Sequence, residues 1–139
     1  DRLLRGPFAL GKMQRALDMC ISWSKQRHTF GKPLAERQAI QWKLVDMYTD
    51  IQSLRALTYQ MAARYDQGED IRVEAGLIKL TSMDWGARCL DHGIQIHGAM
   101  GESLELPLTL FYRYLRHGQI GGGTSEIQRM QIARKLLKD

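Results

Sequence analysis

Three long runs of apolar residues recur at steps of three and four positions, and they constrain the fold more than any other feature. They cover residues 3–27, 36–65 and 72–97 of the 139-residue chain. This spacing places an apolar stripe along one side of an α-helix, and no stretch shows convincing strand alternation. Because only short turns separate the runs, the helices must bury their stripes on one another. The sequence therefore predicts an all-α fold, an up-and-down four-helix bundle.

Two shorter helices are predicted over residues 107–115 and 125–137, the last of which completes the bundle. We expect Phe8 to face inward on the first helix, and Ile127 and Met130 to do so on the last. Gly6-Pro7 is expected to bend the first turns of the chain's first helix. Glycines at positions 76, 86 and 93 weaken the third helix, so they indicate close contact with neighbouring helices.

Composition is that of a folded protein, with 44% hydrophobic residues and no apolar run near the ~20 residues of a membrane span. Asp1 opens the chain inside a helical pattern, so we expect a domain, residues 1–139, cut from a longer protein. Cys20 and Cys89 lie in apolar patterns, which favours reduced thiols and an intracellular origin. The four histidines have no metal-ligand spacing, so no metal site is predicted. The net charge of +5 suits a phosphate-rich ligand or nucleic acid.

The glycine run, Gly121 to Gly123, leads into a helix-start signal. Ser125 and Gln128 fit a capping box, and Glu126 suits the positive end of the helix dipole. Without side chains, the run lets a flat ligand approach the backbone, and the following helix offers N–H groups to an anion or a carbonyl. The alternative is a plain glycine-rich turn between two helices.

Three motifs, in this order, resemble the C-terminal helical domain of the acyl-CoA dehydrogenases. The first is Arg27-His28-Thr29-Phe30-Gly31-Lys32-Pro33-Leu34 followed by Gln38. The second is Gln95-Ile96-His97-Gly98-Ala99-Met100-Gly101, and the third is Gly123-Thr124-Ser125-Glu126-Ile127-Gln128-Arg129. Their order and spacing are similar to those of the family, and they cover essentially the whole chain.

The resemblance implies a flavoenzyme domain that binds FAD between subunits. The family takes a proton from the α-carbon of an acyl-CoA thioester and passes the β-hydride to the flavin. The FAD-binding residues implied are Arg27, Thr29, Phe30, Gln38, Gln95, Ile96, His97, Gly98, Ala99, Thr124, Ser125 and Glu126. The chemistry of the side chains agrees, since an arginine pairs with a pyrophosphate and a phenylalanine packs on an adenine.

The general base of the family is missing from its usual place. Most members carry a glutamate immediately before Gly-Thr-Ser, where this chain has Gly122. A branch typified by isovaleryl-CoA dehydrogenase carries it on the first helix of this domain, at the position of Asp1. The resemblance thus implies Asp1 as the base, with Arg2, Gly122 and Gly123 at the substrate. Glu102 is a weaker candidate.

The resemblance also implies an acyl-CoA substrate, an electron-transfer flavoprotein or similar acceptor, and a homodimer or homotetramer. The expected compartment is the bacterial cytoplasm or the mitochondrial matrix, and the isolated domain is expected to be inactive. Because the usual glutamate is absent, another flavin reaction, of the oxidase or monooxygenase kind, stays open. A helical interaction or nucleic-acid-binding domain is the alternative from a different class, although the basic residues are not interleaved with aromatic ones, which disfavours nucleic acid.

Overall fold

A computed structural model describes residues 1–138. It contains three long helices, α1 (Arg5–Gln26), α2 (Gln38–Asp66) and α3 (Arg72–His97). A short turn of helix, α4 (Ala99–Glu102), precedes α5 (Leu108–Gly118) and α6 (Ser125–Leu136). Two-residue strands β1 (His28–Thr29) and β2 (Lys32–Pro33) and a 3-10 turn, η1 (Leu34–Glu36), connect α1 to α2.

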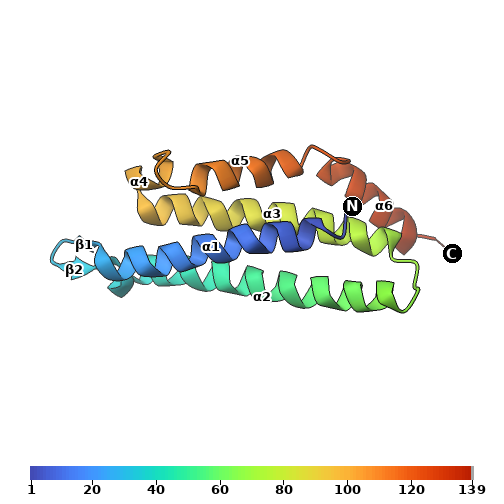
Figure 1. The fold of residues 1–139 in the computed structure, drawn as a ribbon, viewed down its shortest axis with the longest axis horizontal. Helices are drawn as coiled ribbons and strands as arrows, with labels where there is room; N and C mark the ends of the chain where they lie inside the picture. The colour runs from blue at the N-terminus through green and yellow to red at the C-terminus, as the bar shows by residue number, and fades with distance from the viewer. Residues whose placement is uncertain (139) are drawn as a thin grey trace.

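The long helices run up and down beside one another, and α5 and α6 follow α3 on its other side (Figure 1). The all-α, up-and-down bundle is therefore confirmed. One detail differs from the expectation, because the fourth place in the bundle is shared. α5 packs along one half of α3 and α6 along the other, so the last helix alone does not complete the bundle.

The core gathers around α3, which packs against α1, α2, α5 and α6. Its glycines lie at the contacts, as the sequence predicted. A Cβ on Gly86 would lie 2.8 Å from Leu115 Cδ1 of α5, and one on Gly76 would lie 2.9 Å from Gln128 Oε1 of α6. A side chain at either position would therefore push the helices apart. The most buried apolar residues are Ala9, Met13, Ala16, Cys20, Met47, Ile51, Leu54, Ile78, Met83, Cys89, Leu90, Leu108 and Leu115.

Two of the expected inward faces are wrong. Phe8 is 55% exposed, whereas its small neighbour Ala9 is fully buried on the inner face of α1. On α6 the fully or nearly buried residues are the polar Ser125 and Gln128, whereas Ile127 and Met130 are each 40% exposed. The polar face of α6 is inward because it meets polar groups of α3 and of the glycine run, not an apolar stripe.

The predicted capping box is also wrong in its details. Thr124, not Ser125, caps α6, since its hydroxyl accepts the backbone N–H of Ile127 at 3.4 Å. Ser125 instead donates to Asp84 Oδ1 of α3 at 3.2 Å. The first helix begins at Arg5 rather than at residue 3, which places Pro7 in its first turn, where a missing N–H costs no hydrogen bond.

A tight hairpin follows α1, where the sequence predicted a turn. His28 pairs with Pro33 and Thr29 with Lys32. Phe30 and Gly31 form its tip with φ angles of 48° and 77°, and Arg37 donates to the Thr29 carbonyl at 2.6 Å. Gly31 supplies the expected positive φ, but Phe30 adopts one as well, which costs a side-chain-bearing residue free energy. The hairpin thus holds an aromatic ring, 98% exposed, at the end of the bundle.

Candidate functional site at the two ends of the bundle

The predicted site residues gather at two opposite ends of the bundle. One group lies where α1 ends, by the β1–β2 hairpin, and the other lies where the chain begins, by the start of α6 (Figure 1). We call the cavity at the first end the hairpin-end pocket. It measures about 390 Å³ and is lined by Trp23, Arg27, Thr29, Leu34, Ile40, Gln95, Ile96, His97, Gly98, Ala99 and Met100.

Seven of the predicted cofactor residues, Arg27 among them, line the hairpin-end pocket, although they come from two distant segments. The C-terminal end of α3 supplies Gln95 to Ala99, and the end of α1 with the hairpin supplies Arg27 and Thr29. Within residues 1–138 the guanidinium of Arg27 makes no hydrogen bond or ion pair, so its donors are available to a ligand. Gly98 has a φ of 60°, and a Cβ there would meet nothing within 4 Å. The pocket therefore combines a cation, an amide and open backbone.

The pocket's residues differ in how they can contribute. Gln95 is exposed, whereas Ile96 is 3% exposed and belongs to the core. His97 is 6% exposed, its Nδ1 lies 2.8 Å from the Gly93 carbonyl, and its ring stacks on Trp23. Ile96 and His97 thus form part of the pocket wall, while Arg27 and Gln95 supply the polar groups that a ligand could contact.

Two predicted cofactor residues near the hairpin do not line the hairpin-end pocket. Phe30 stands at the hairpin tip, away from the bundle, and Gln38 is exposed at the start of α2. The Gln38 side chain makes no hydrogen bond in the described part of the chain, and the Phe30 ring has no polar group that needs one. Their position would suit a ligand held by another polypeptide segment, rather than one enclosed by this chain alone.

At the other end, the start of the chain lies against the glycine run. Arg5 Nη2 is 3.4 Å from Asp1 Oδ2, and a Cβ on Gly122 would lie 3.7 Å from the same nitrogen. The Asp1 side chain is 78% exposed. The carboxylate and the glycine run thus both approach one guanidinium nitrogen, although 121 positions separate Asp1 from Gly122.

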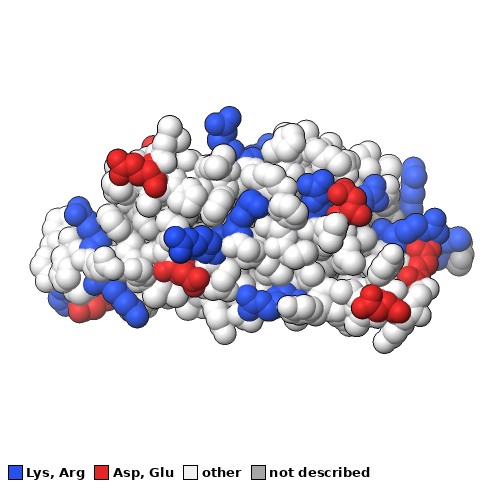
Figure 2. Space-filling view, viewed as in Figure 1, with Lys and Arg blue, Asp and Glu red and all other residues white. Residues whose placement is uncertain are grey.

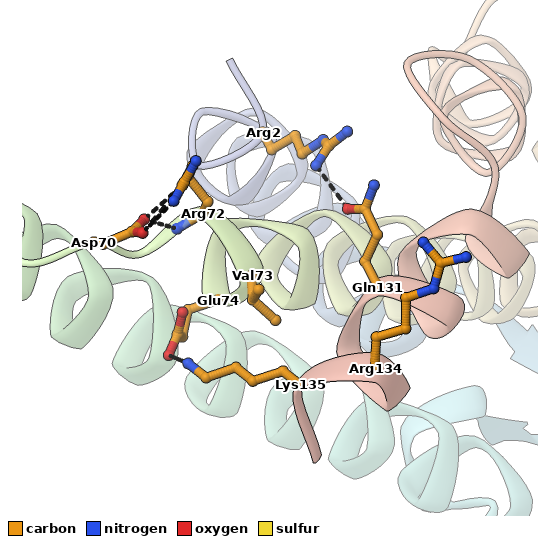
Figure 3. A pocket seen from close by; sticks show the side chains of 8 residues that line it. All are labelled: Arg2, Asp70, Arg72, Val73, Glu74, Gln131, Arg134 and Lys135. Carbon is orange, nitrogen blue, oxygen red and sulfur yellow. Dashed lines mark hydrogen bonds and ion pairs between the residues drawn. The ribbon is translucent and has the colours of Figure 1, made fainter. Parts of the chain in front are cut away.

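Arg2 joins the same end of the bundle to the last helix. Its Nη1 donates to Gln131 Oε1 of α6 at 2.9 Å, and its Nη2 lies 3.9 Å from where a Cβ on Gly123 would be. Arg2 also lines a cavity of about 450 Å³ (Figure 3), with Asp70, Arg72, Val73, Glu74, Gln131, Arg134 and Lys135. Figure 3 shows the Asp70–Arg72 and Glu74–Lys135 pairs at its wall, so much of its charge is internally neutralised.

The start of α6 presents the third predicted motif. Glu126 is exposed in the first turn, and the pKa of its carboxyl lies below the usual value because its own backbone N–H and the Thr124 hydroxyl hydrogen-bond the carboxylate. A carboxyl held in its ionised form suits a hydrogen-bond acceptor better than a base that must be regenerated. Ser125 is 6% exposed and bonded to Asp84, so it contributes to the structure of the turn.

Three residues at this end of the bundle were not predicted from the sequence. Arg5 was not singled out, nor were Lys79 and Gln128 as neighbours of the glycine run. Lys79 Nζ donates to the Gly123 carbonyl at 2.5 Å, and Gln128 Nε2 donates to the same oxygen at 3.1 Å. Lys79 follows Gly76 by three positions and precedes Gly86 by seven, so it lies on the glycine face of α3. A lysine on a face of small residues was the available signal.

Four further observations concern the position of Glu102, possible metal ligands, membrane-spanning helices and the distribution of surface charge. Glu102 lies in α4, at the hairpin end of the bundle and far from the glycine run (Figure 1). Residues 1–138 contain no group of three potential metal ligands. No helix among them is both long and apolar enough to cross a bilayer. Figure 2 shows acidic side chains interspersed with the basic ones on the face drawn, which is unlike the continuous basic surface of most nucleic-acid-binding domains.

Both cysteines are core residues, as predicted. Cys20 and Cys89 are fully buried and are not disulfide-bonded. Burial raises the pKa of each thiol to about 12, so neither is a nucleophile at neutral pH. Cys20 Sγ lies 3.8 Å from His97 Nδ1, but that nitrogen already faces the Gly93 carbonyl. The pair therefore belongs to the packing behind the hairpin-end pocket.

Comparison with known proteins gives a consistent result. The sequence model of the acyl-CoA dehydrogenase C-terminal domain matches residues 1–137. Rat mitochondrial short-chain specific acyl-CoA dehydrogenase is 39% identical over 130 residues, which are 94% of this chain and 32% of the rat protein. Rice mitochondrial isovaleryl-CoA dehydrogenase is 37% identical over 139 residues, covering all of this chain and 34% of the rice protein.

Solved structures agree with the sequence comparisons. Butyryl-CoA dehydrogenase from Megasphaera elsdenii superposes with a TM-score of 0.94 at 36% identity, over 99% of this chain and 36% of that one. The chain thus spans about a third of the length of the relatives it matches. The matched region includes both ends of the bundle and all three motifs, and we conclude that the chain belongs to the acyl-CoA dehydrogenase family, of which it represents the C-terminal domain.

Proposed function

We propose that the chain is the C-terminal, FAD- and acyl-CoA-binding and oligomerisation domain of an FAD-dependent acyl-CoA dehydrogenase. The observation that carries the proposal is that Asp1 and Gly122 both lie close to Arg5 Nη2. The glycine run lacks the family's usual glutamate, and Asp1, which contacts the same Arg5 nitrogen that Gly122 approaches, is the carboxylate proposed in its place. Relatives such as the rat short-chain specific acyl-CoA dehydrogenase and the Megasphaera butyryl-CoA dehydrogenase support the reaction class.

The hairpin-end pocket fits one part of the cofactor. Arg27 would pair with the pyrophosphate, and Gln95 with a ribose or base edge, because these side chains face the pocket and have donors to spare. Phe30 and Gln38 would reach a cofactor held by a neighbouring subunit. Thr124 and Glu126, at the opposite end of the bundle, would contact the flavin part of a different FAD molecule. The same arrangement supports a homo-oligomer, since one bundle would then serve two cofactors.

The reaction would take place at the glycine run. FAD, when bound, supplies the acceptor for the hydride that leaves the β-carbon of the acyl chain. Asp1 would remove the α-proton, and Arg5 would orient its carboxylate through the 3.4 Å contact. Among residues 1–138, no acceptor is found for the N–H groups of Gly122, Gly123 and Thr124. These donors would stabilise the charge that develops on the thioester oxygen as the proton leaves.

The proposal is tested on the full-length protein. Purified intact, it should be yellow and should be bleached anaerobically by an acyl-CoA, with the electrons then passing to an electron-transfer flavoprotein or a similar acceptor. A colourless protein that cannot be reconstituted with FAD would refute the flavoenzyme assignment. The relatives include bacterial and mitochondrial proteins. Finding the full-length protein in the bacterial cytoplasm or in the mitochondrial matrix would therefore agree with the proposal.

A second candidate keeps the fold and the cofactor but changes the reaction. It is favoured by the glycine at position 122 and by the exposure of the Asp1 side chain, which leaves the base without a desolvated setting in this chain. A monooxygenase reaction, which does not begin with removal of a proton from an acyl chain, would need no such base at this place. Flavin that oxidises rapidly in air and is not reduced by any acyl-CoA under anaerobic conditions would favour this alternative.

A further inference from the structure

Lys79 is a buried lysine whose ammonium group faces the glycine run. It lies on α3 and is 1% exposed, which makes it one of the largest fully buried side chains of the protein. Its Nζ donates to the Gly123 carbonyl oxygen at 2.5 Å. Gln128 of α6, which is 0% exposed, donates to the same oxygen from Nε2 at 3.1 Å. Two buried donors therefore fix a single carbonyl in the functional turn.

The charge around Lys79 makes this placement costly. No carboxylate within residues 1–138 lies at ion-pair distance from its Nζ, and Arg5 and Arg2 add positive charge nearby. Asp84 and Glu126 attract the ammonium group without forming an ion pair with it, and desolvation is the main cause of a pKa below the usual value. A methionine would fill the same volume without burying a charge. Stability alone does not explain a lysine here.

The geometry of the peptide bond shows what the lysine achieves. In a trans peptide the C=O and the N–H of the following residue point in opposite directions. Because the Gly123 carbonyl points inward to Lys79 and Gln128, the Thr124 N–H points outward, away from both. Gly122 and Gly123 have φ angles of 69° and 90°, so without these two hydrogen bonds the turn could reorient easily. Donors to the carbonyl also polarise the peptide and strengthen its N–H as a donor.

We propose that Lys79 is a positioning residue that holds the Gly123–Thr124 peptide so that its N–H donates to a carbonyl oxygen bound at the glycine run. The inference rests on the proposed function, because it needs a bound ligand at this place. The ligand group is a carbonyl acceptor, which either the acyl-CoA thioester or the flavin ring supplies. Lys79 does not touch the reacting atoms and acts through the backbone of the turn.

The test uses the full-length protein and Lys79→Met, which keeps the length of the side chain and removes the donor. We expect bound FAD and oligomeric state to be retained, kcat to fall about 10- to 100-fold, and KM to change less than about threefold. Infrared spectra supply the second readout, with ¹³C in the thioester carbonyl in one arm and in the flavin ring carbonyls in the other. Whichever carbonyl the turn binds should show a smaller shift to low frequency in Lys79→Met than in wild type.

Ser82→Ala is the matched control, because Ser82 is equally buried on α3 but its hydroxyl donates to the Lys79 carbonyl of its own helix. It should leave both carbonyl bands and kcat at wild-type values. If Lys79→Met does not fold, Gln128→Met removes the second donor and should give the same changes in smaller measure. Unchanged carbonyl bands and kcat in whichever variant folds would overturn the inference. Wild-type protein that no acyl-CoA reduces would instead refute the proposed function.

Discussion

Arg5 Nη2 lies 3.4 Å from Asp1 Oδ2, and the same nitrogen faces the glycine run at Gly122. One carboxylate oxygen of Asp1 is therefore held near a residue of the helix that follows it. A base on this side of the site would approach the α-carbon from the start of α1, whereas a glutamate at position 122 would approach from the turn. The proposed role of Asp1 as the base rests on this contact.

Asp1→Asn should lower the rate constant of anaerobic flavin reduction in the full-length protein by about 10²- to 10⁴-fold. The asparagine keeps the size of the side chain and a hydrogen-bond acceptor for Arg5, but it cannot accept the α-proton. Stopped-flow absorbance of the flavin measures the rate directly. Glu102→Gln is the control, because Glu102 lies at the other end of the bundle and should leave the rate unchanged. Full activity of Asp1→Asn would remove Asp1 from this role.

Gly118→Ala should destabilise the protein by about 1–3 kcal/mol, although alanine is the better helix former. A Cβ at this position would lie 2.0 Å from Met83 Sδ, and Met83 is fully buried, so it has little room to move. Gly11→Ala is the matched control in α1, where a Cβ meets nothing within 4 Å. That variant should gain about 0.5–1 kcal/mol. Thermal unfolding followed by circular dichroism compares the two, and equal midpoints would contradict the packing described.

The sequence predicted the long helices well because their signals are local. The three- and four-residue spacing, the Gly31 turn and the glycines of α3 each depend on near neighbours in the chain. The direction of the Phe8 and Met130 side chains depends on which helix packs where, and small residues such as Ala9 replace large ones at close contacts. Apolar spacing alone could not distinguish these faces.

The candidate site was predictable only in part, for a related reason. The motifs around Arg27, Gln95 and Thr124 were identified from the sequence, and the structure gathers the first two in one pocket. The contact of Arg5 with the glycine run joins segments from opposite ends of the chain, so no local spacing reveals it. Lys79 was missed because its place on the glycine face of α3 indicates burial but not a partner, and that partner, the Gly123 carbonyl, is 44 positions away.

Arg88→Met should cost more stability than the removal of other surface arginines. Arg88 binds Asp50 through two nitrogens, at 3.0 and 2.5 Å, and the Asp50 side chain is only 10% exposed. Loss of the arginine leaves a largely buried carboxylate without its partner, and we expect a destabilisation of about 1–3 kcal/mol, since Arg88 itself is half exposed.

The control for Arg88 is Arg129→Met. Arg129 pairs with Asp84 at 2.8 Å, but that carboxylate is 30% exposed and also accepts the Ser125 hydroxyl. Its removal should cost about 0–1 kcal/mol. Denaturant unfolding of both variants measures the loss in free energy of unfolding. If Arg88→Met loses no more than Arg129→Met, the buried pair stabilises the fold no more than an exposed pair does.

Asp70 should make the stability of the protein depend on pH in the acid range. Hydrogen bonds from the Arg72 side chain and backbone N–H lower the pKa of Asp70 to about 2. A carboxyl with a lowered pKa in the folded state stabilises that state above its ordinary pKa, and the stabilisation is lost as the pH falls through the folded value. The thermal midpoint of wild type should therefore exceed that of Asp70→Asn above about pH 4, and the difference should shrink toward pH 2. A difference that stays constant over this range would contradict the assignment.

Arg27→Met should weaken FAD binding to the full-length protein by about 10- to 100-fold, the loss expected for a charge-assisted hydrogen bond. The Arg27 guanidinium lines the hairpin-end pocket and makes no hydrogen bond or ion pair within residues 1–138, so its removal breaks no internal polar interaction. Lys25→Met removes the same charge two positions earlier, from an exposed residue that does not line the pocket. Titration of the two apoproteins with FAD, followed by flavin fluorescence, separates a specific contact from a general effect of charge. Equal weakening in both variants would mean that the positive field of this end, rather than Arg27, attracts the cofactor. Weakening in Arg27→Met alone would place the pyrophosphate at the hairpin-end pocket.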